Sequence, residues 1–224
     1  MSGTDLFRGA SFAALLFDMD GTLLSSIEAA ERIWSRWAAR HGLDVETFLP
    51  TIHGKRAVET IAALGLPGVD AVHEADQLTL AEMDDMGGIR AIDGAVDFLA
   101  GLPGHRWAIV TSAPRPLALR RLAAAGVPVP DLLITADDVV NGKPRPDCYL
   151  LAAERLGVDI AACLVVEDAP AGIAAGEASG AAVLVVAATH REEMATPHPT
   201  IGSYAELVIT LEDGGVRVHR APAA

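Results

Sequence analysis

Cysteine and positive charge are scarce in this 224-residue sequence, and each shortage excludes a class of protein. The two cysteines, Cys148 and Cys163, are too few for a disulfide framework, and both stand beside apolar residues, as small buried thiols do. Only 17 lysines and arginines stand against 30 aspartates and glutamates, which gives a formal net charge of -13. This balance argues against a nucleic-acid-binding protein and against docking on an anionic membrane, because both partners require a basic face.

Long apolar runs are missing as well. The apolar stretch near the N-terminus follows a single Arg8 and stops at Asp18, so it is too short and too weakly basic for a signal peptide. No other run approaches the length of a membrane span. We therefore expect a cytoplasmic protein.

Hydrophobic residues nevertheless make up 51% of the chain, enough for a large core. Short runs rich in leucine and β-branched residues predict strands at 12–17, 107–112, 131–135, 163–168 and 182–187. Because these runs are continuously apolar, they are typical of a parallel sheet covered on both faces. Helical patterns that end on a glycine lie between them, at 115–126, 147–157 and 171–180. The alternation predicts a doubly wound, Rossmann-like parallel α/β sheet.

One long stretch interrupts this alternation, because residues 24–91 show helical patterns and no strand pattern. The segment 25–42 begins with two serines in position to cap a helix and repeats its apolar residues at helical spacing. We therefore predict a small all-helical cap domain, residues 24–91, inserted after the first strand. Residues 1–23 and 92–224 would form the α/β catalytic core, ending in a hairpin over 207–219 that turns at 213–215.

Polar side chains follow several of the predicted strands. In an open α/β sheet, ligands bind outside the carboxyl ends of the strands, so these side chains are expected to converge on one crevice. They are Asp18 and Asp20 after the first strand, Thr111 and Ser112 after the second, Lys143 in a later loop, and Glu167 and Asp168 after the strand at 163–168.

The chemistry of this set is consistent with phosphoryl transfer. Four carboxylates in one site repel one another unless a cation intervenes, and all-oxygen ligands suit Mg²⁺. One carboxylate can act as a nucleophile, and a second can protonate the departing alcohol and then activate water. A hydroxyl group and an ammonium group can bind the remaining phosphate oxygens.

The motifs "DMDGTL", "VTS", "GKPRPDCY" and "VVEDAPAGIAAG", in this order and spacing, resemble the four signature motifs of the haloacid dehalogenase superfamily. The helical insert resembles the cap of its β-phosphoglucomutase-like branch. The resemblance implies Asp18 as nucleophile and Mg²⁺ ligand, and Asp20 as general acid/base that also binds the metal through its backbone carbonyl. It further implies that Thr111 and the Ser112 backbone bind phosphate, that Lys143 screens charge, and that Glu167 and Asp168 hold Mg²⁺.

The motif "HGKR" at 53–56 resembles the cap loop of the relatives that act on glycerol phosphates and 2-deoxy-sugar phosphates. This resemblance implies that the cap loop contacts the leaving group of the substrate. The residues expected to bind substrate are His53, Lys55 and Arg56 of this loop, Ser112 beside the phosphate, and Arg115 and Asn141, which border the site. Relatives commonly carry Asp-Ser where this chain has Ser25-Ser26, and either a change in cap closure or a helix cap would account for the difference.

The function predicted is a Mg²⁺-dependent phosphatase for a small sugar or polyol phosphate, working through an aspartyl-phosphate and, given the small cap, as a monomer. A phosphomutase of the same superfamily is the alternative, although Thr22 after Gly21 is usual in the phosphatases. Asp20 argues against a dehalogenase, and the "HGKR" context argues against a phosphonatase that would use Lys55. A non-enzymatic sugar-phosphate sensor would be expected to lose Asp18 or Asp20, and both are present.

Overall fold

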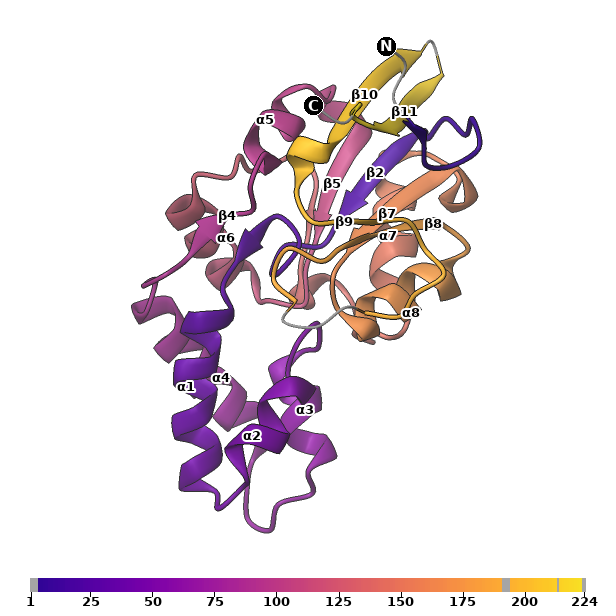
Figure 1. The fold of residues 1–224 in the computed structure, drawn as a ribbon. Helices are drawn as coiled ribbons and strands as arrows, with labels where there is room; N and C mark the ends of the chain where they lie inside the picture. The colour runs from indigo at the N-terminus through magenta and orange to yellow at the C-terminus, as the bar shows by residue number, and fades with distance from the viewer. Residues whose placement is uncertain (1–3, 191–193, 213, 223–224) are drawn as a thin grey trace.

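A six-stranded parallel sheet forms the centre of the computed structural model, which describes residues 4–190, 194–212 and 214–222 (Figure 1). The strand order is β6-β5-β2-β7-β8-β9. The strands are β2 (Ala14–Phe17), β5 (Trp107–Val110), β6 (Leu133–Ile134), β7 (Cys163–Glu167), β8 (Ala182–Val186) and β9 (Thr200–Ile201). Every residue of β2, β5 and β7 is buried, as expected of strands covered on both faces. The predicted α/β class with a parallel sheet is confirmed.

Helices cover both faces of this sheet. Leucines and aromatics of α5 (Ala95–Ala100) and α6 (Arg115–Ala125) pack in one hydrophobic cluster, and α7 (Asp147–Leu156) and α8 (Pro170–Ser179) contribute to the other. The last three helices end as the sequence predicts, because each stops at a glycine in the left-handed conformation. Short 3₁₀ helices lie at Leu49–Thr51, Gly104–Arg106, Ala136–Asp138, Ile160–Ala162 and Tyr204–Glu206.

A separate helical unit lies beyond the carboxyl ends of the strands (Figure 1). It comprises α1 (Ile27–Arg40), α2 (Val45–Phe48), α3 (Ala57–Ala63) and α4 (Ala71–Asp84). This unit has its own hydrophobic core, in which Trp34 packs against Trp37 and Phe48 with ring centroids 5.7 and 5.8 Å away. We call residues 27–84 the helical insert; the predicted domain boundaries at 24 and 91 stay predictions.

The expectation that residues 24–91 contain no strand is wrong at both ends. β3 (Leu24–Ser25) and β4 (Arg90–Ala91) pair antiparallel and join the entry of the helical insert to its exit. Two-residue strands have no detectable periodicity, so the pairing arises from tertiary structure alone.

A second, antiparallel sheet closes the N- and C-terminal end of the molecule, with strand order β1-β11-β10. β1 (Thr4–Asp5) pairs with β11 (Gly215–Arg220), which forms the predicted hairpin with β10 (Leu207–Glu212). Asp213, in the expected turn, lies outside the described residues. Within the described ranges, no helix is both long and apolar enough to cross a membrane.

Candidate active site

Asp18 is the first residue after β2, and its side chain is buried against a single cation. Its backbone N–H donates to the carbonyl of Val166 at 2.9 Å, which extends the strand pairing and fixes the position of the carboxylate. The ammonium of Lys143 lies 2.6 Å from Asp18 Oδ1 and 2.7 Å from Glu167 Oε1, and it also donates to the carbonyl of Val110 at 3.1 Å. The structure therefore brings together three side chains that lie far apart in the sequence.

Burial and charge act on this cluster in opposite directions. Burial disfavours the Lys143 ammonium, but the carboxylates of Asp18 and Glu167 outweigh it and raise the pKa of this lysine well above its ordinary value. Burial raises the pKa of Asp18 to about 8, although the Lys143 ammonium opposes the shift. Burial also raises the pKa of Asp168 well above its ordinary value, and Glu167 and Asp18 add to this effect. One lysine is thus too little positive charge for three buried carboxyl groups.

A divalent cation fits this deficit. Asp18, Glu167 and Asp168 each offer a carboxylate oxygen, and these oxygens lie within 4.8 Å of one another. Hard oxygen donors with net negative charge match what Mg²⁺ prefers in proteins. The donor set is therefore suited to a hard divalent cation.

Glu167 accepts more hydrogen bonds than the other two carboxylates of the cluster. Its Oε1 accepts hydrogen bonds from Lys143 and from the Tyr149 hydroxyl at 2.8 Å. Its Oε2 accepts from the backbone N–H groups of Asp168 and Ala169 at 3.0 and 3.2 Å. These four bonds occupy lone pairs that a metal ion would otherwise use. Glu167 thus holds Lys143 and the following loop in place, besides offering an oxygen to the acidic cluster.

Two glycines allow the backbone to approach these carboxylates closely. A Cβ on Gly21 would lie 2.0 Å from Asp168 Oδ2, and Gly21 has φ +90°, which favours glycine. A Cβ on Gly172 would lie 1.6 Å from Glu167 Oε1. Gly172 of α8 is therefore packed directly against a carboxylate of the site.

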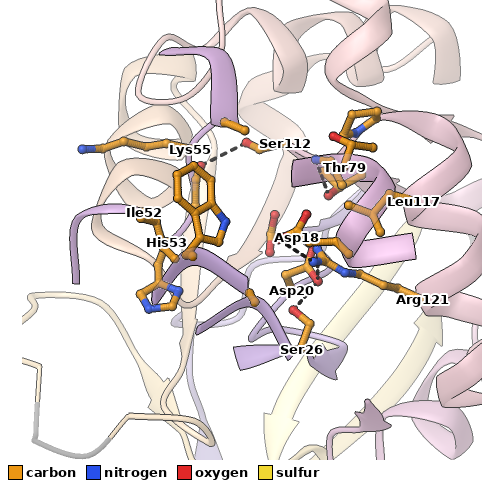
Figure 2. A pocket seen from close by; sticks show the side chains of 18 residues that line it. Asp18, Asp20, Ser26, Ile52, His53, Lys55, Thr79, Ser112, Leu117 and Arg121 are labelled. Carbon is orange, nitrogen blue, oxygen red and sulfur yellow. Dashed lines mark hydrogen bonds and ion pairs between the residues drawn. The ribbon is translucent and has the colours of Figure 1, made fainter. Parts of the chain in front are cut away.

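Asp20 accepts hydrogen bonds from two donors that do not belong to this cluster. Its Oδ1 accepts from the Ser26 hydroxyl at 2.6 Å and from an Arg121 NH group at 3.0 Å (Figure 2). Ser26 stands at the N-cap of α1 but makes no capping hydrogen bond with its side chain. The expectation that the serines cap this helix is therefore wrong for Ser26, because its hydroxyl binds Asp20 instead.

A pocket opens above Asp18 and Asp20, between the sheet and the helical insert (Figure 2). Thr111 and Ser112 line it from the loop after β5. Ser112 Oγ also donates to the carbonyl of Gly54 at 3.0 Å, so the "HGKR" loop contacts the core directly.

The residues expected to bind substrate divide into two groups. Besides Ser112, His53 and Lys55 line the pocket, and burial lowers the pKa of His53 although Glu31 and Asp20 oppose the shift. The other three have different partners and are not among the described residues that line the pocket. Arg56 forms an ion pair with Glu59 and donates to the Val139 and Val140 carbonyls, Arg115 pairs with Asp138, and Asn141 donates to Asp147.

Sequence reasoning missed part of the pocket wall, namely Thr79 and Glu82 of α4 and Arg121 of α6. One signal was available for Arg121, since it lies four residues after Leu117, on the buried face of α6. An arginine on such an apolar stripe requires a buried partner.

Comparison with known proteins adds four findings. A family model described as a haloacid dehalogenase-like hydrolase matches residues 12–180. Hexitol phosphatase A of Escherichia coli is 46% identical over 175 residues, which cover 76% of this chain and 81% of that protein. Glycerol-1-phosphate phosphohydrolase 2 of Saccharomyces cerevisiae is 35% identical, over 79% of this chain and 75% of that protein. The solved structure of CbbY from Rhodobacter sphaeroides in complex with phosphate has a TM-score of 0.72 and 26% identity, covering 87% of this chain and 96% of that one.

Proposed function

This chain belongs to the haloacid dehalogenase-like hydrolase family, and from that premise we propose that it is a Mg²⁺-dependent phosphatase for small sugar or polyol phosphates. The observation that carries the proposal is the position of Asp18, beside Lys143 and Asp168 and at the floor of a pocket that the helical insert covers. Hexitol phosphates are the first candidates, because hexitol phosphatase A has 46% identity to this chain.

The metal would be held by the carboxylates of Asp18 and Asp168 and by the backbone carbonyl of Asp20, with Glu167 beside them as a further ligand or as the partner of Lys143. When bound, Mg²⁺ supplies positive charge to the phosphate oxygens and keeps the Asp18 carboxyl ionised. These assignments are supported by the buried acidic cluster and its unbalanced charge.

The proposed reaction has two steps. An oxygen of Asp18 attacks phosphorus, the bond to the substrate alcohol breaks, and Asp20 gives its proton to the departing oxygen. Water then attacks the aspartyl-phosphate, Asp20 takes a proton from that water, and inorganic phosphate and the Asp18 carboxylate are regenerated. Throughout, the Thr111 hydroxyl and the Ser112 backbone N–H bind the remaining phosphate oxygens, and the Lys143 ammonium screens the negative charge of Asp18 and the phosphate.

The rest of the substrate would lie against the helical insert. His53 and Lys55 line the pocket and are proposed to bind hydroxyl groups of the leaving alcohol. Arg56, Arg115 and Asn141 are proposed to act from the rim, by holding the loop 136–141 in place. That the protein works as a monomer in the cytoplasm stays a prediction; its two free, buried cysteines are compatible with a reducing compartment.

The test is phosphate release from a panel of hexitol, polyol and sugar phosphates, with Mg²⁺ and with EDTA. We expect hydrolysis that is strongest on hexitol or related polyol phosphates, is lost in EDTA, and is lost in Asp18→Asn while the fold is retained. Conversion of one sugar phosphate into its isomer without phosphate release would replace the proposal with a phosphomutase. Binding of a sugar phosphate with no turnover of any kind would contradict both.

A further inference from the structure

Arg121 links the proposed general acid/base to the helical insert. This arginine belongs to α6 of the core. Its NH1 group donates to Asp20 Oδ1 at 3.0 Å, and its NH2 group lies 3.3 Å from Glu82 Oε1 on α4 of the insert. In Figure 2, Arg121 and Ser26 both lie next to Asp20, the residue to which each donates a hydrogen bond.

Burial makes this link more than a surface ion pair. The side chain of Arg121 is 7% exposed and that of Glu82 is 11% exposed. An arginine removed from water to this extent is stable only with charged partners, and here both partners also line the pocket. Its Nε atom is buried and has no hydrogen-bond partner among the described residues. The guanidinium therefore pairs with Asp20 and Glu82 while its Nε–H group is left without a hydrogen bond to any described residue.

The contacts of Asp20 define what this arrangement does to it. Ser26 and Arg121 both donate to the same oxygen, Oδ1, so the carboxyl group is oriented from two sides. The other oxygen, Oδ2, is then the one that carries a proton to the leaving group and receives one from water. A protonated Oδ2 leaves Oδ1 able to accept both hydrogen bonds, so the orientation is kept in both protonation states.

We propose that Arg121 is a positioning residue for Asp20, and that its ion pair with Glu82 makes the orientation of Asp20 depend on the position of the helical insert. This inference rests on the proposed phosphatase function, in which Asp20 protonates the departing alcohol. Closure of the insert over a substrate would then orient the Asp20 carboxyl group at the same moment as it covers the reacting bond.

A comparison of leaving groups separates positioning of an acid from a general structural role. A hexitol leaves as a poor alkoxide and depends on protonation, whereas p-nitrophenol leaves readily without it. The constant kcat/KM includes only steps up to departure of the leaving group, so the later role of Asp20 toward water does not enter it. We would therefore measure kcat/KM for sorbitol 6-phosphate and p-nitrophenyl phosphate in parallel.

Arg121→Met is expected to lower kcat/KM for the hexitol phosphate about 100-fold, and for p-nitrophenyl phosphate by about threefold or less. Arg121→Lys should recover about tenfold of the first loss, because an ammonium can still pair with Asp20. Glu82→Gln should show a smaller loss with the same dependence on the leaving group. If Arg121→Met fails to fold, the comparison of the two substrates is made with Arg121→Lys and Glu82→Gln.

Arg120→Met is the matched control. Arg120 is the neighbouring arginine on α6, and it also contacts α4, by donating to the Met83 carbonyl at 2.7 Å, but it is not part of the site. This variant should hydrolyse both compounds like the wild type. Equal losses on both substrates in the Arg121 variants, or a rise in KM alone, would overturn the inference. Failure of the wild type to release phosphate from either compound would instead refute the proposed function.

Discussion

Lys143 Nζ lies 2.6 Å from Asp18 Oδ1, and both side chains are almost fully buried. The same ammonium lies 2.7 Å from Glu167 Oε1, so one cation serves two carboxylates. A buried ion pair contributes little net stability when complete, but removal of one partner leaves a charge without compensation. The pairing of Lys143 with Asp18 should therefore matter for stability as well as for the proposed catalysis.

Replacement of Lys143 by methionine should reduce both stability and activity. In EDTA, we expect the free energy of unfolding in urea to fall by about 3–5 kcal/mol, because Asp18 and Glu167 lose their shared cation. Activity with Mg²⁺ should fall by about 100-fold or more, because the positive charge beside Asp18 and the phosphate is lost. Lys55→Met is the control for stability; Lys55 is exposed, and its loss should change the unfolding free energy by no more than about 0.5 kcal/mol. Equal unfolding curves for the two variants would refute the structural role.

Much of the fold could be predicted because its signals are local. The apolar runs of β2, β5 and β7 are continuous, and Gly126, Gly157 and Gly180 mark helix ends by a conformation that other residues avoid. Strands β3, β4 and β9 have two residues each and form only because distant segments meet, so no local pattern indicates them.

The residues of the candidate site also divide into those that the sequence predicts and those that it does not. Asp18, Thr111 and Asp168 directly follow strands, so topology alone brings them to one edge of the sheet. The partners of Asp20 could not be predicted from position in this way. Ser26 has the sequence context of a helix cap, and Arg121 lies in a helix whose contact with α4 depends on the placement of the insert. The donors that orient the Asp20 carboxylate are brought to it only by the tertiary structure. The sequence alone indicates that such donors are needed, but not which residues supply them.

Gly21→Ala and Gly180→Ala form a pair that separates backbone strain from steric conflict. The two glycines have nearly equal φ angles, +90° and +88°, but a Cβ at Gly180 meets no described atom within 4 Å, whereas a Cβ at Gly21 would overlap Asp168. Gly180→Ala should cost about 1–2 kcal/mol of unfolding free energy from strain alone. Gly21→Ala should cost more and should also weaken Mg²⁺ binding, measured by calorimetry, because the Asp168 carboxylate must move. Equal effects of the two substitutions would show that Asp168 tolerates the displacement.

Asp168→Asn should abolish the response of the protein to Mg²⁺ without destabilising the metal-free form. The amide oxygen can still accept the hydrogen bond that Thr22 Oγ1 donates at 3.0 Å. The substitution also removes a carboxyl group whose pKa is raised by burial and by Glu167, so the charged form is disfavoured there without metal. In EDTA the variant should therefore unfold at the same temperature as the wild type or above it.

In the presence of Mg²⁺, the melting temperatures of the wild type and Asp168→Asn should differ. A ligand present at about 100 times its Kd stabilises a protein by about 2.7 kcal/mol, so the wild type should melt several degrees higher with the metal. Asp168→Asn should show no such shift, and Asp131→Asn, which removes an exposed acid outside the site, should respond like the wild type. An equal Mg²⁺ response in all three proteins would place the metal elsewhere.

The pH dependence of stability should contain a contribution from His53. Burial lowers the pKa of this histidine below its ordinary value of 6.5, with Glu31 and Asp20 opposing the shift. As pH falls through 6.5, the unfolded chain takes up the proton before the folded protein does, so the linkage relation makes stability decrease on acidification. The contribution of His53 is therefore fully present above pH 6.5 and is lost as the pH falls toward the folded-state pKa.

The measurement is the free energy of unfolding of wild type and His53→Gln at pH 5 and pH 7.5, in EDTA. The raised pKa values of Asp18 and Asp168 are present in both proteins and cancel in the comparison. The gain in stability from pH 5 to pH 7.5 should be larger in the wild type, because only its histidine must lose a proton to be buried without penalty. Parallel pH dependence in the two proteins would mean that the folded protein accommodates the charged imidazole, with Glu31 and Asp20 compensating its burial. His53 would then be placed to bind an anionic substrate as a cation rather than hydroxyl groups as a neutral ring.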